Sequence, residues 1–530
     1  MNKKSETQQS KFNWLPLIIL MITQIGTTGD NAVLSIATKS IIETFSVTMN
    51  EIQLANMMYP MIAGSFMITS GMLGISFGFK NVFRVGAILA TIGELTLALT
   101  NNITIFIWVG RVLVGFGGSL MIPAVLGLIP EIYKSSKHRA IAFGSIGAAS
   151  GIATIAPLLL GIIMDQVGYK LTFGIMAAYF FIILLGSYFI PNTDRVQTKL
   201  KLDVQGIVMA AVGLFTFLIG LSKISKWGLI TPADPPFTIF GISPALPLVV
   251  LGIVILIALV FVEKKIEEKN GFALLPQSFI KNRQVRNGLY GSAFIFLIMG
   301  AYNVVVIPYV QIMEGFDATK TSLLTMAFGV TLFLFSFFIP KFAQNIKSKT
   351  ILRLGYLVVA LSIVPLLLAI GDGSTNISLF SIGILIMGAG EGLVSSRCNV
   401  VVANAVNERD AKQSGGIQAT SRNVGQAFGA ALIGTILLFS VTMMTNNIVD
   451  KKVSELSAET VQVIAEQEQH QYVNDQQYNE FLEANNIMGE DKVKMEEIND
   501  VVRVKSTKVA LGAIGIISLI FLLGTRGIKE

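Results

Sequence analysis

Four ionisable residues lie inside long apolar stretches of this chain, namely Asp30, Glu94, Arg111 and Glu391. Within a membrane helix such a side chain costs about 3 kcal/mol or more, so each needs a functional or a pairing reason. A desolvated carboxylate can alternately hold a proton and a cationic substrate, and a buried arginine can organise it. We therefore take Asp30, Glu94 and Glu391 as candidate proton- or substrate-binding residues.

Structural explanations compete with these functional ones. Asp30 could form a permanent ion pair with a buried arginine, and Arg111 could serve only as the structural partner of a carboxylate. Glu94 could simply hydrogen-bond a neighbouring helix. Arg397, nearer the end of its apolar stretch, is of lower interest. The sequence leaves these alternatives open.

Small residues accompany the candidate charges. Gly115 and Gly118 follow Arg111 at i+4 and i+7, on the same face of a helix, where they let another helix approach closely. Two further stretches repeat this pattern of glycine or proline along one helix. They contain Gly144, Gly147, Gly151, Pro157 and Gly161 in one case, and Arg422, Gly425, Gly429 and Gly434 in the other. Such faces favour helices that pack tightly or rock against each other.

The elements that position these residues are membrane-spanning helices. The 530 residues are 52% hydrophobic and only 14% charged, against roughly 25% charged residues in soluble domains. With about 20 apolar residues per span, the sequence predicts an all-α polytopic membrane protein with fourteen transmembrane helices. The predicted spans are 14–38, 52–73, 82–100, 103–126, 140–163, 171–190, 205–224, 244–262, 287–312, 321–340, 350–370, 378–403, 417–443 and 507–525.

Positive charge alternates between the predicted loops. Lysine and arginine occupy the N-terminal tail, every second loop and the C-terminal tail, as shown by Lys3, Lys80, Lys137, Lys199, Lys265, Lys347, Lys412 and Lys529. The positive-inside rule then predicts that both termini are cytoplasmic. We expect a multi-pass, monomeric protein of the cell membrane, surrounded by lipid. The net charge of +7 thus indicates orientation and no nucleic-acid partner.

One predicted loop differs from the others. Residues 446–500 hold thirteen acids and four lysines, a net charge of −9. Apolar residues at helical spacing predict two amphipathic helices, one between Lys451 and Glu468 and one around Tyr478 and Phe481. The segment is either a solvated acidic loop or a lid or antechamber that attracts cations.

The sequence contains few of the residues that metal binding and histidine-based catalysis require. One cysteine, Cys398, and two histidines, His138 and His470, argue against a metal site and against histidine-based catalysis. A phosphate-binding glycine loop for ATP is missing. We expect no enzyme activity, no metal and no cofactor, with the proton gradient as the energy source.

These residues resemble the fourteen-helix drug:proton antiporter branch of the major facilitator superfamily. The run from Asp30 to Ala37 resembles the first-helix motif of that branch, Arg111 with Gly115 and Gly117 its fourth-helix motif, and Ala156, Pro157 and Gly161 its fifth-helix antiporter motif. The stretches 275–286, 311–316 and 415–429 are similar as well. Gly71 to Lys80 keep the glycines of the loop after the second helix, but Ile75 stands where the family usually has Asp.

The resemblance implies two six-helix bundles that alternate in giving access to a midplane site. It implies a cytoplasmic tail (1–13), an N-terminal bundle (14–190), a linker with two extra helices (191–270) and a C-terminal bundle (271–530), whose acidic hairpin covers 446–505. It also implies proton-coupled export of amphipathic, often cationic, drugs or biocides. Export of an endogenous lipid or metabolite is the alternative, and a membrane enzyme or sensor is a remote one.

Overall fold

The structure of the chain is a computed structural model. It describes residues 12–133, 156–192, 203–270, 273–343, 345–371, 374–403, 411–467 and 470–525, with single residues and pairs between 135 and 153. In these ranges the chain is built of helices, and its extended pairing is limited to isolated bridges such as Ile239 with Ile242. A helix satisfies all its backbone hydrogen bonds internally, which a chain surrounded by lipid requires.

Long helices form the body of the molecule. They are α1 (Trp14–Ile36), α3 (Met49–Phe77), α4 (Phe79–Leu99), α6 (Val112–Ile132), α8 (Ala156–Gly186), α9 (Val204–Trp227), α10 (Ala245–Asn270), α12 (Arg283–Ile312), α13 (Ala318–Phe342), α14 (Ser348–Ala369), α15 (Ile377–Ala403), α16 (Ala411–Lys451) and α19 (Gly489–Gly524). The short helices are α2 (Thr38–Phe45), α5 (Ile103–Ile105), the π-helix η1 (Phe106–Arg111), the 3₁₀ turns η2 (Ser187–Phe189) and η3 (Val453–Glu455), α11 (Gln277–Lys281), α17 (Ala458–Glu466) and α18 (Asp475–Ala484).

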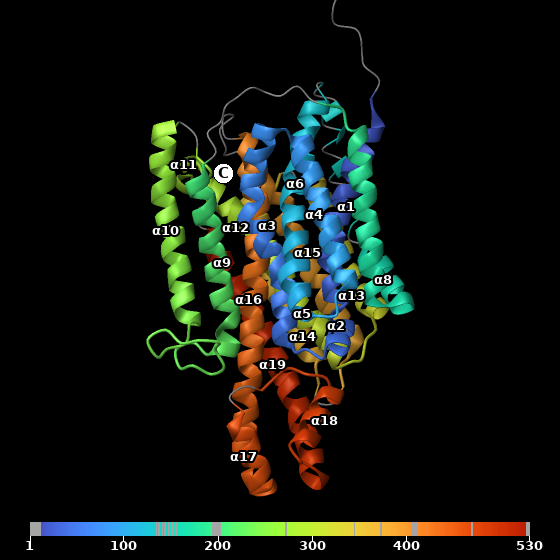
Figure 1. Ribbon diagram of the computed structural model, residues 1–530, viewed down its shortest axis with the longest axis vertical. Coiled ribbons are helices and arrows are strands. Elements are labelled where there is room, and N and C mark those ends of the chain that lie inside the picture. Colours follow the sequence, from blue (N-terminus) through green and yellow to red (C-terminus); the bar gives the residue numbers. More distant parts are fainter. Residues whose placement is uncertain are drawn as a thin grey trace, which may run out of the picture.

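The long helices run side by side along the longest axis (Figure 1). Helices α9 and α10 pack on each other at one side, and α9 joins this pair to α3 and α16. The outer face of α10 exposes a continuous apolar surface, which includes Val250, Leu251, Val254, Ile257 and Phe261. Such a face is stable against lipid and unfavourable in water.

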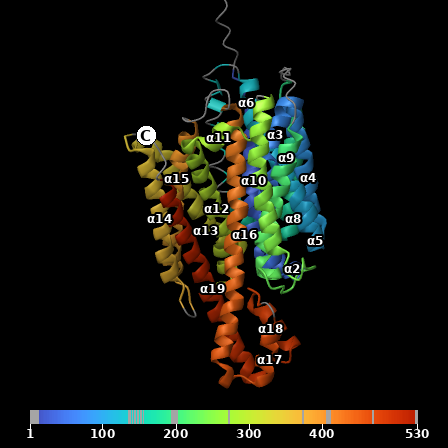
Figure 2. The same ribbon diagram turned by 90° about the vertical axis from the view of Figure 1, so that its left-hand side faces the viewer.

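The acidic segment forms a projection at one end of the bundle. Helices α16 and α19 continue past their predicted spans, and α17 and α18 connect them (Figure 2). The two short amphipathic helices that the sequence predicts are therefore present, and they bury Ile464 and Leu482. The ends of the range 446–505, where we expect an acidic loop or hairpin, are helical extensions of α16 and α19. We call residues 446–505 the hairpin.

The prediction of fourteen spans is not confirmed, since twelve helices of the described ranges are long and apolar enough to cross a membrane. Helix α3 covers the predicted span 52–73 but is not among these twelve, and it buries the polar residues Gln53, Asn56 and Thr69. The predicted span 140–163 is described in part, as residues 156–163 and a few residues between 141 and 153. Its last part belongs to α8, which is interrupted at Gly168 by a φ of +78°, so that spans 140–163 and 171–190 meet in one element.

Candidate functional site

A buried ion pair connects two helices of the N-terminal part of the chain. Arg111 Nη1 donates to Asp30 Oδ1 at 3.2 Å, and both side chains are fully buried. Asp30 comes from α1, whereas Arg111 is the last residue of η1, immediately before α6. A π-helical turn is rare and is often found at functional sites. Arg111 is thus the buried arginine that a permanent ion pair with Asp30 requires.

The glycines after Arg111 bring α3 close to this pair. A Cβ at Gly115 would lie 2.9 Å from Ile62 Cβ, and one at Gly118 would overlap the phenol of Tyr59. This close packing places the Tyr59 ring 5.4 Å from the guanidinium carbon of Arg111, a cation–π distance. The expectation that Gly115 and Gly118 permit a tight helix contact is confirmed.

Glu94 of α4 completes the cluster. It is fully buried and interacts electrostatically with Asp30 and Arg111. A Cβ at the preceding Gly93 would lie 2.8 Å from the amide nitrogen of Val114, so the backbones of α4 and α6 touch beside these charges. The structure thus gathers Asp30, Glu94 and Arg111, which are far apart in the sequence. We call these three residues and Tyr59 the N-terminal cluster.

The N-terminal cluster has more acidic than basic groups. When Asp30 and Glu94 are both ionised, the single guanidinium leaves a net charge of −1 in a buried place, which is costly. Among the described residues, both Glu94 oxygens and the Nε and Nη2 atoms of Arg111 have no hydrogen-bond partner. One proton, or one monovalent cation, would balance the charge.

Glu391 lies apart from this cluster, in α15. Its side chain is fully buried, and neither oxygen has a hydrogen-bond partner in the described part of the chain. Neighbouring helices occupy the space beside the glycines around it. A Cβ at Gly390 would lie 2.8 Å from the amide nitrogen of Val359, and one at Gly392 would lie 2.6 Å from the carbonyl oxygen of Leu332. These glycines serve close packing on α14 and α13.

The remaining predicted residues lie at helix contacts. A Cβ at Gly161 would lie 2.7 Å from the carbonyl oxygen of Ala318 in α13, and Pro157 is buried one turn earlier in α8. Gly425 and Gly429 of α16 press against the backbone of α12. The guanidinium carbon of Arg422 lies 5.7 Å from the ring centre of Phe296. Gly144, Gly147, Gly151 and the side chain of Ile75 lie outside the described residues.

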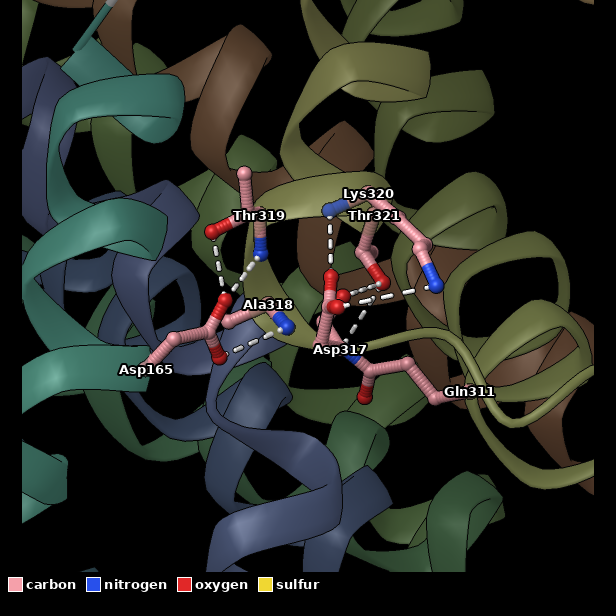
Figure 3. A network of polar contacts seen from close by, with 7 residues as sticks. All are labelled: Asp165, Gln311, Asp317, Ala318, Thr319, Lys320 and Thr321. Atoms are coloured by element: carbon pink, nitrogen blue, oxygen red, sulfur yellow. Dashed lines mark hydrogen bonds and ion pairs between the residues drawn. The ribbon is translucent and has the colours of Figure 1, made fainter.

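A polar connection between α8 and α13 was not predicted from the sequence. The Asp165 carboxylate accepts hydrogen bonds from the backbone amides of Ala318 at 3.0 Å and Thr319 at 2.7 Å, at the start of α13 (Figure 3). The start of α13 is also capped by its own Asp317, through the amide of Lys320. Asp165 thus adds a cap from a distant helix, in the place where a helix N-terminus favours negative charge.

Gln311, at the end of α12, makes a second connection. It accepts from the Lys39 amide at 3.1 Å and donates to the Ile36 carbonyl oxygen at 2.8 Å, and so joins α12 to α1 and α2. Further along, Gln53 of α3 donates to the carbonyl oxygen of Ala431. These bonds join residues 12–192 to residues 273–525 at the hairpin end of the bundle. The sequence offers two signals for Gln311, its polarity at the end of an apolar span and its place at the start of the stretch 311–316 that resembles the family.

The comparisons with known proteins agree with this architecture. The family model of the Major Facilitator Superfamily matches residues 20–430. A probable actinorhodin transporter of Streptomyces coelicolor is 24% identical over 430 residues, which are 80% of this chain and 72% of that protein.

Other relatives are named for different compounds. The riboflavin transporter RibZ of Clostridioides difficile is 24% identical, over 82% of this chain and 90% of that protein. The quinolone resistance protein NorB of Staphylococcus aureus is 23% identical, over 76% of this chain and 84% of that protein. Among solved structures, a bacterial homologue of the human lysosomal transporter Spinster superposes with a TM-score of 0.62 at 13% identity, over 98% of both chains.

Proposed function

The chain belongs to the Major Facilitator Superfamily and is a transmembrane transporter, and from this premise we propose that it exports amphipathic organic cations in exchange for protons. The relatives that are named for drugs or antibiotics support export of such compounds. The transporter lies in the cell membrane as a monomer among lipids, with both termini in the cytoplasm, as the alternating positive loops predict. No cofactor is required besides the proton gradient.

The charge balance of the N-terminal cluster is the observation that carries this proposal. Arg111 neutralises one of the two carboxyl groups, Asp30 or Glu94, and the other must hold a proton or face a cation. A proton that enters from outside would displace the cationic substrate from the carboxylate. Loss of that proton to the cytoplasm would make the carboxylate free to bind the next cation. Glu391 remains a candidate for a second protonation site in the C-terminal part.

The connections made by Asp165 and Gln311 support an alternating-access cycle. With both termini in the cytoplasm, the hairpin lies outside, and these bonds close the transporter at its outer end. In the opposite state they must break, so that the substrate can leave. Gly161 of α8 packs closely on α13 at the same contact, so these two helices must separate there as well.

Transport measurements in inside-out vesicles test this proposal. The vesicles are energised with a proton gradient that is followed by a pH-sensitive dye, and tetraphenylphosphonium or another organic cation is then added. We expect the cation to release protons with the wild type and with Asp234→Asn, an exposed acid of the α9–α10 connection, but not with Asp30→Asn. An Asp30→Asn protein that still couples cation movement to protons would refute the role of Asp30.

Export of a neutral or anionic metabolite is the second candidate function. The riboflavin transporter among the relatives favours it. In that case the same vesicles would accumulate the metabolite, and organic cations would leave the proton gradient unchanged in the wild type. This result would refute proton-coupled cation export while leaving the transporter class intact.

A further inference from the structure

A cavity lies where the hairpin meets the bundle. It has a volume of about 350 Å³, within the range of about 300–1,000 Å³ that is typical of small-molecule sites. One wall is formed by α2 and the turn that follows it, and the other by α16, α18, α19 and the chain before α18. The residues that define its chemistry are Glu43, Ser46, His470, Tyr478, Glu480 and Phe481.

The lining of this cavity is acidic and aromatic. Glu43 and Glu480 contribute two carboxylates from opposite walls, and no Lys or Arg lines it among the described residues. The rings of Tyr478 and Phe481 stack with centroids 6.1 Å apart. Burial lowers the pKa of His470 to about 4, so its ring is neutral at physiological pH and adds no positive charge.

Hydrogen bonds hold the two walls in place. Gln477 of α18 donates to the carbonyl oxygen of Val47 at 3.0 Å, which connects the hairpin to the turn between α2 and α3. His470 is fixed on the α16 side by Asn446 at 2.9 Å and by Thr442, which accepts from its backbone amide at 3.2 Å. The cavity is therefore bounded by connected elements on both sides.

We propose that this cavity is a second binding site, outside the membrane region, for organic cations that carry aromatic groups. Two carboxylates without a basic neighbour attract positive charge, and aromatic faces bind cations and flat rings. The volume is far larger than a bare metal ion needs, and the described residues contain no cluster of three or more metal-ligating side chains. The ligand class is the one that the proposed function exports, and to that extent the inference rests on it.

The position of the cavity connects ligand binding to the closure of the hairpin end. A ligand between Glu43 and Glu480 contacts α2 in the N-terminal part and the hairpin in the C-terminal part. Both walls lie at the end where Asp165 and Gln311 join the two parts of the chain. A bound cation therefore stabilises the closed state of this end.

Equilibrium binding to the purified full-length protein tests the site. Tetraphenylphosphonium is used as the probe in an Asp30→Asn, Glu94→Gln background, which removes the acidic groups of the N-terminal cluster. We expect this background still to bind the probe. The added changes Glu43→Gln and Glu480→Gln should weaken binding about tenfold, and added salt should weaken it further, because the carboxylates are exposed.

The matched control is Glu466→Gln, which removes an exposed carboxylate of α17 that does not line the cavity. We expect it to bind the probe like the background, and thermal unfolding checks that all variants are folded. Equal affinities for the cavity and control variants, or no binding in the background, would overturn the site. Neither result bears on proton coupling in vesicles, so failure of this inference is distinguishable from failure of the proposed function.

Discussion

The two parts of the chain bury their carboxyl groups in different ways. In residues 12–192, Asp30 and Glu94 share one guanidinium, that of Arg111. In residues 273–525, Glu391 is equally buried but has no hydrogen-bond partner in the described chain. A lone buried carboxylate has no neighbouring charge to compensate its own, so its ionised form is costly. We therefore expect Glu391, which has no balancing charge beside it, to contribute less to proton coupling than Asp30 and Glu94.

Removal of the balancing charge should have the largest effect. Arg111→Gln leaves two buried carboxyl groups without a cation, which typically costs about 3–5 kcal/mol. We expect a lower unfolding temperature in detergent and no cation-driven proton release. Arg111→Lys is the control, because it keeps the charge and should lose less stability. A stable, transporting Arg111→Gln protein would show that the pair is dispensable.

The next largest effect should come from Glu94. Glu94→Gln leaves Asp30 and Arg111 as a neutral pair that has no site for the exchanged proton. Proton release on addition of cations should fall by roughly 100-fold, as for loss of an acid–base group, while the unfolding temperature changes little. Glu94→Asp keeps the carboxyl group and should retain part of the activity. Normal coupling in Glu94→Gln would assign the exchanged proton to another group.

A smaller effect is expected at the connection between the two parts. Asp165→Ala removes the cap that α8 supplies to α13, worth about 1–2 kcal/mol for a helix N-terminus. The population open at the hairpin end should then rise. Distances between spin labels at Lys39→Cys and Lys320→Cys, in a Cys398→Ser background, measure this shift, with Asp234→Asn as the control. An unchanged distance distribution would contradict the role of Asp165 in closure.

Glu391 should show the smallest effect. Glu391→Gln replaces the carboxyl group with an amide of similar shape, so we expect vesicle transport within about twofold of the wild type and stability within about 1 kcal/mol. The same vesicles and the same cation as for Asp30→Asn allow a direct comparison. Loss of proton coupling would instead make Glu391 a second proton carrier and would remove the contrast between the two parts.

The sequence predicted the elements better than their ends. Apolar runs identified most of the long helices, because lipid-facing and buried residues are both apolar. They did not show that α16 and α19 continue into the hairpin, since Lys451 and Glu490 are compatible with a polar loop or a polar helix. The break that they predicted between 163 and 171 contains the turn at Gly168, where α8 has a positive φ.

The site was partly predictable for a similar reason. Asp30, Glu94, Arg111 and Glu391 stand out because charge in an apolar run is expensive. Their grouping does not follow from spacing, and neither does the separation of Glu391 from the other three. Asp165 gave no signal, since a polar residue near a helix end is ordinary, and Gln311 was marked only as the first residue of a stretch that resembles the family.

What the sequence by itself determined is the class of the protein, an α-helical membrane protein with a few expensive charges, because composition and hydropathy act locally along the chain. Only the tertiary structure decided which charges meet: close packing at Gly93, Gly115 and Gly118 brings α3, α4 and α6 together around Arg111. Electrostatic energies depend on distances of a few ångströms between helices. Those distances are decided by side-chain packing between segments that are remote in sequence.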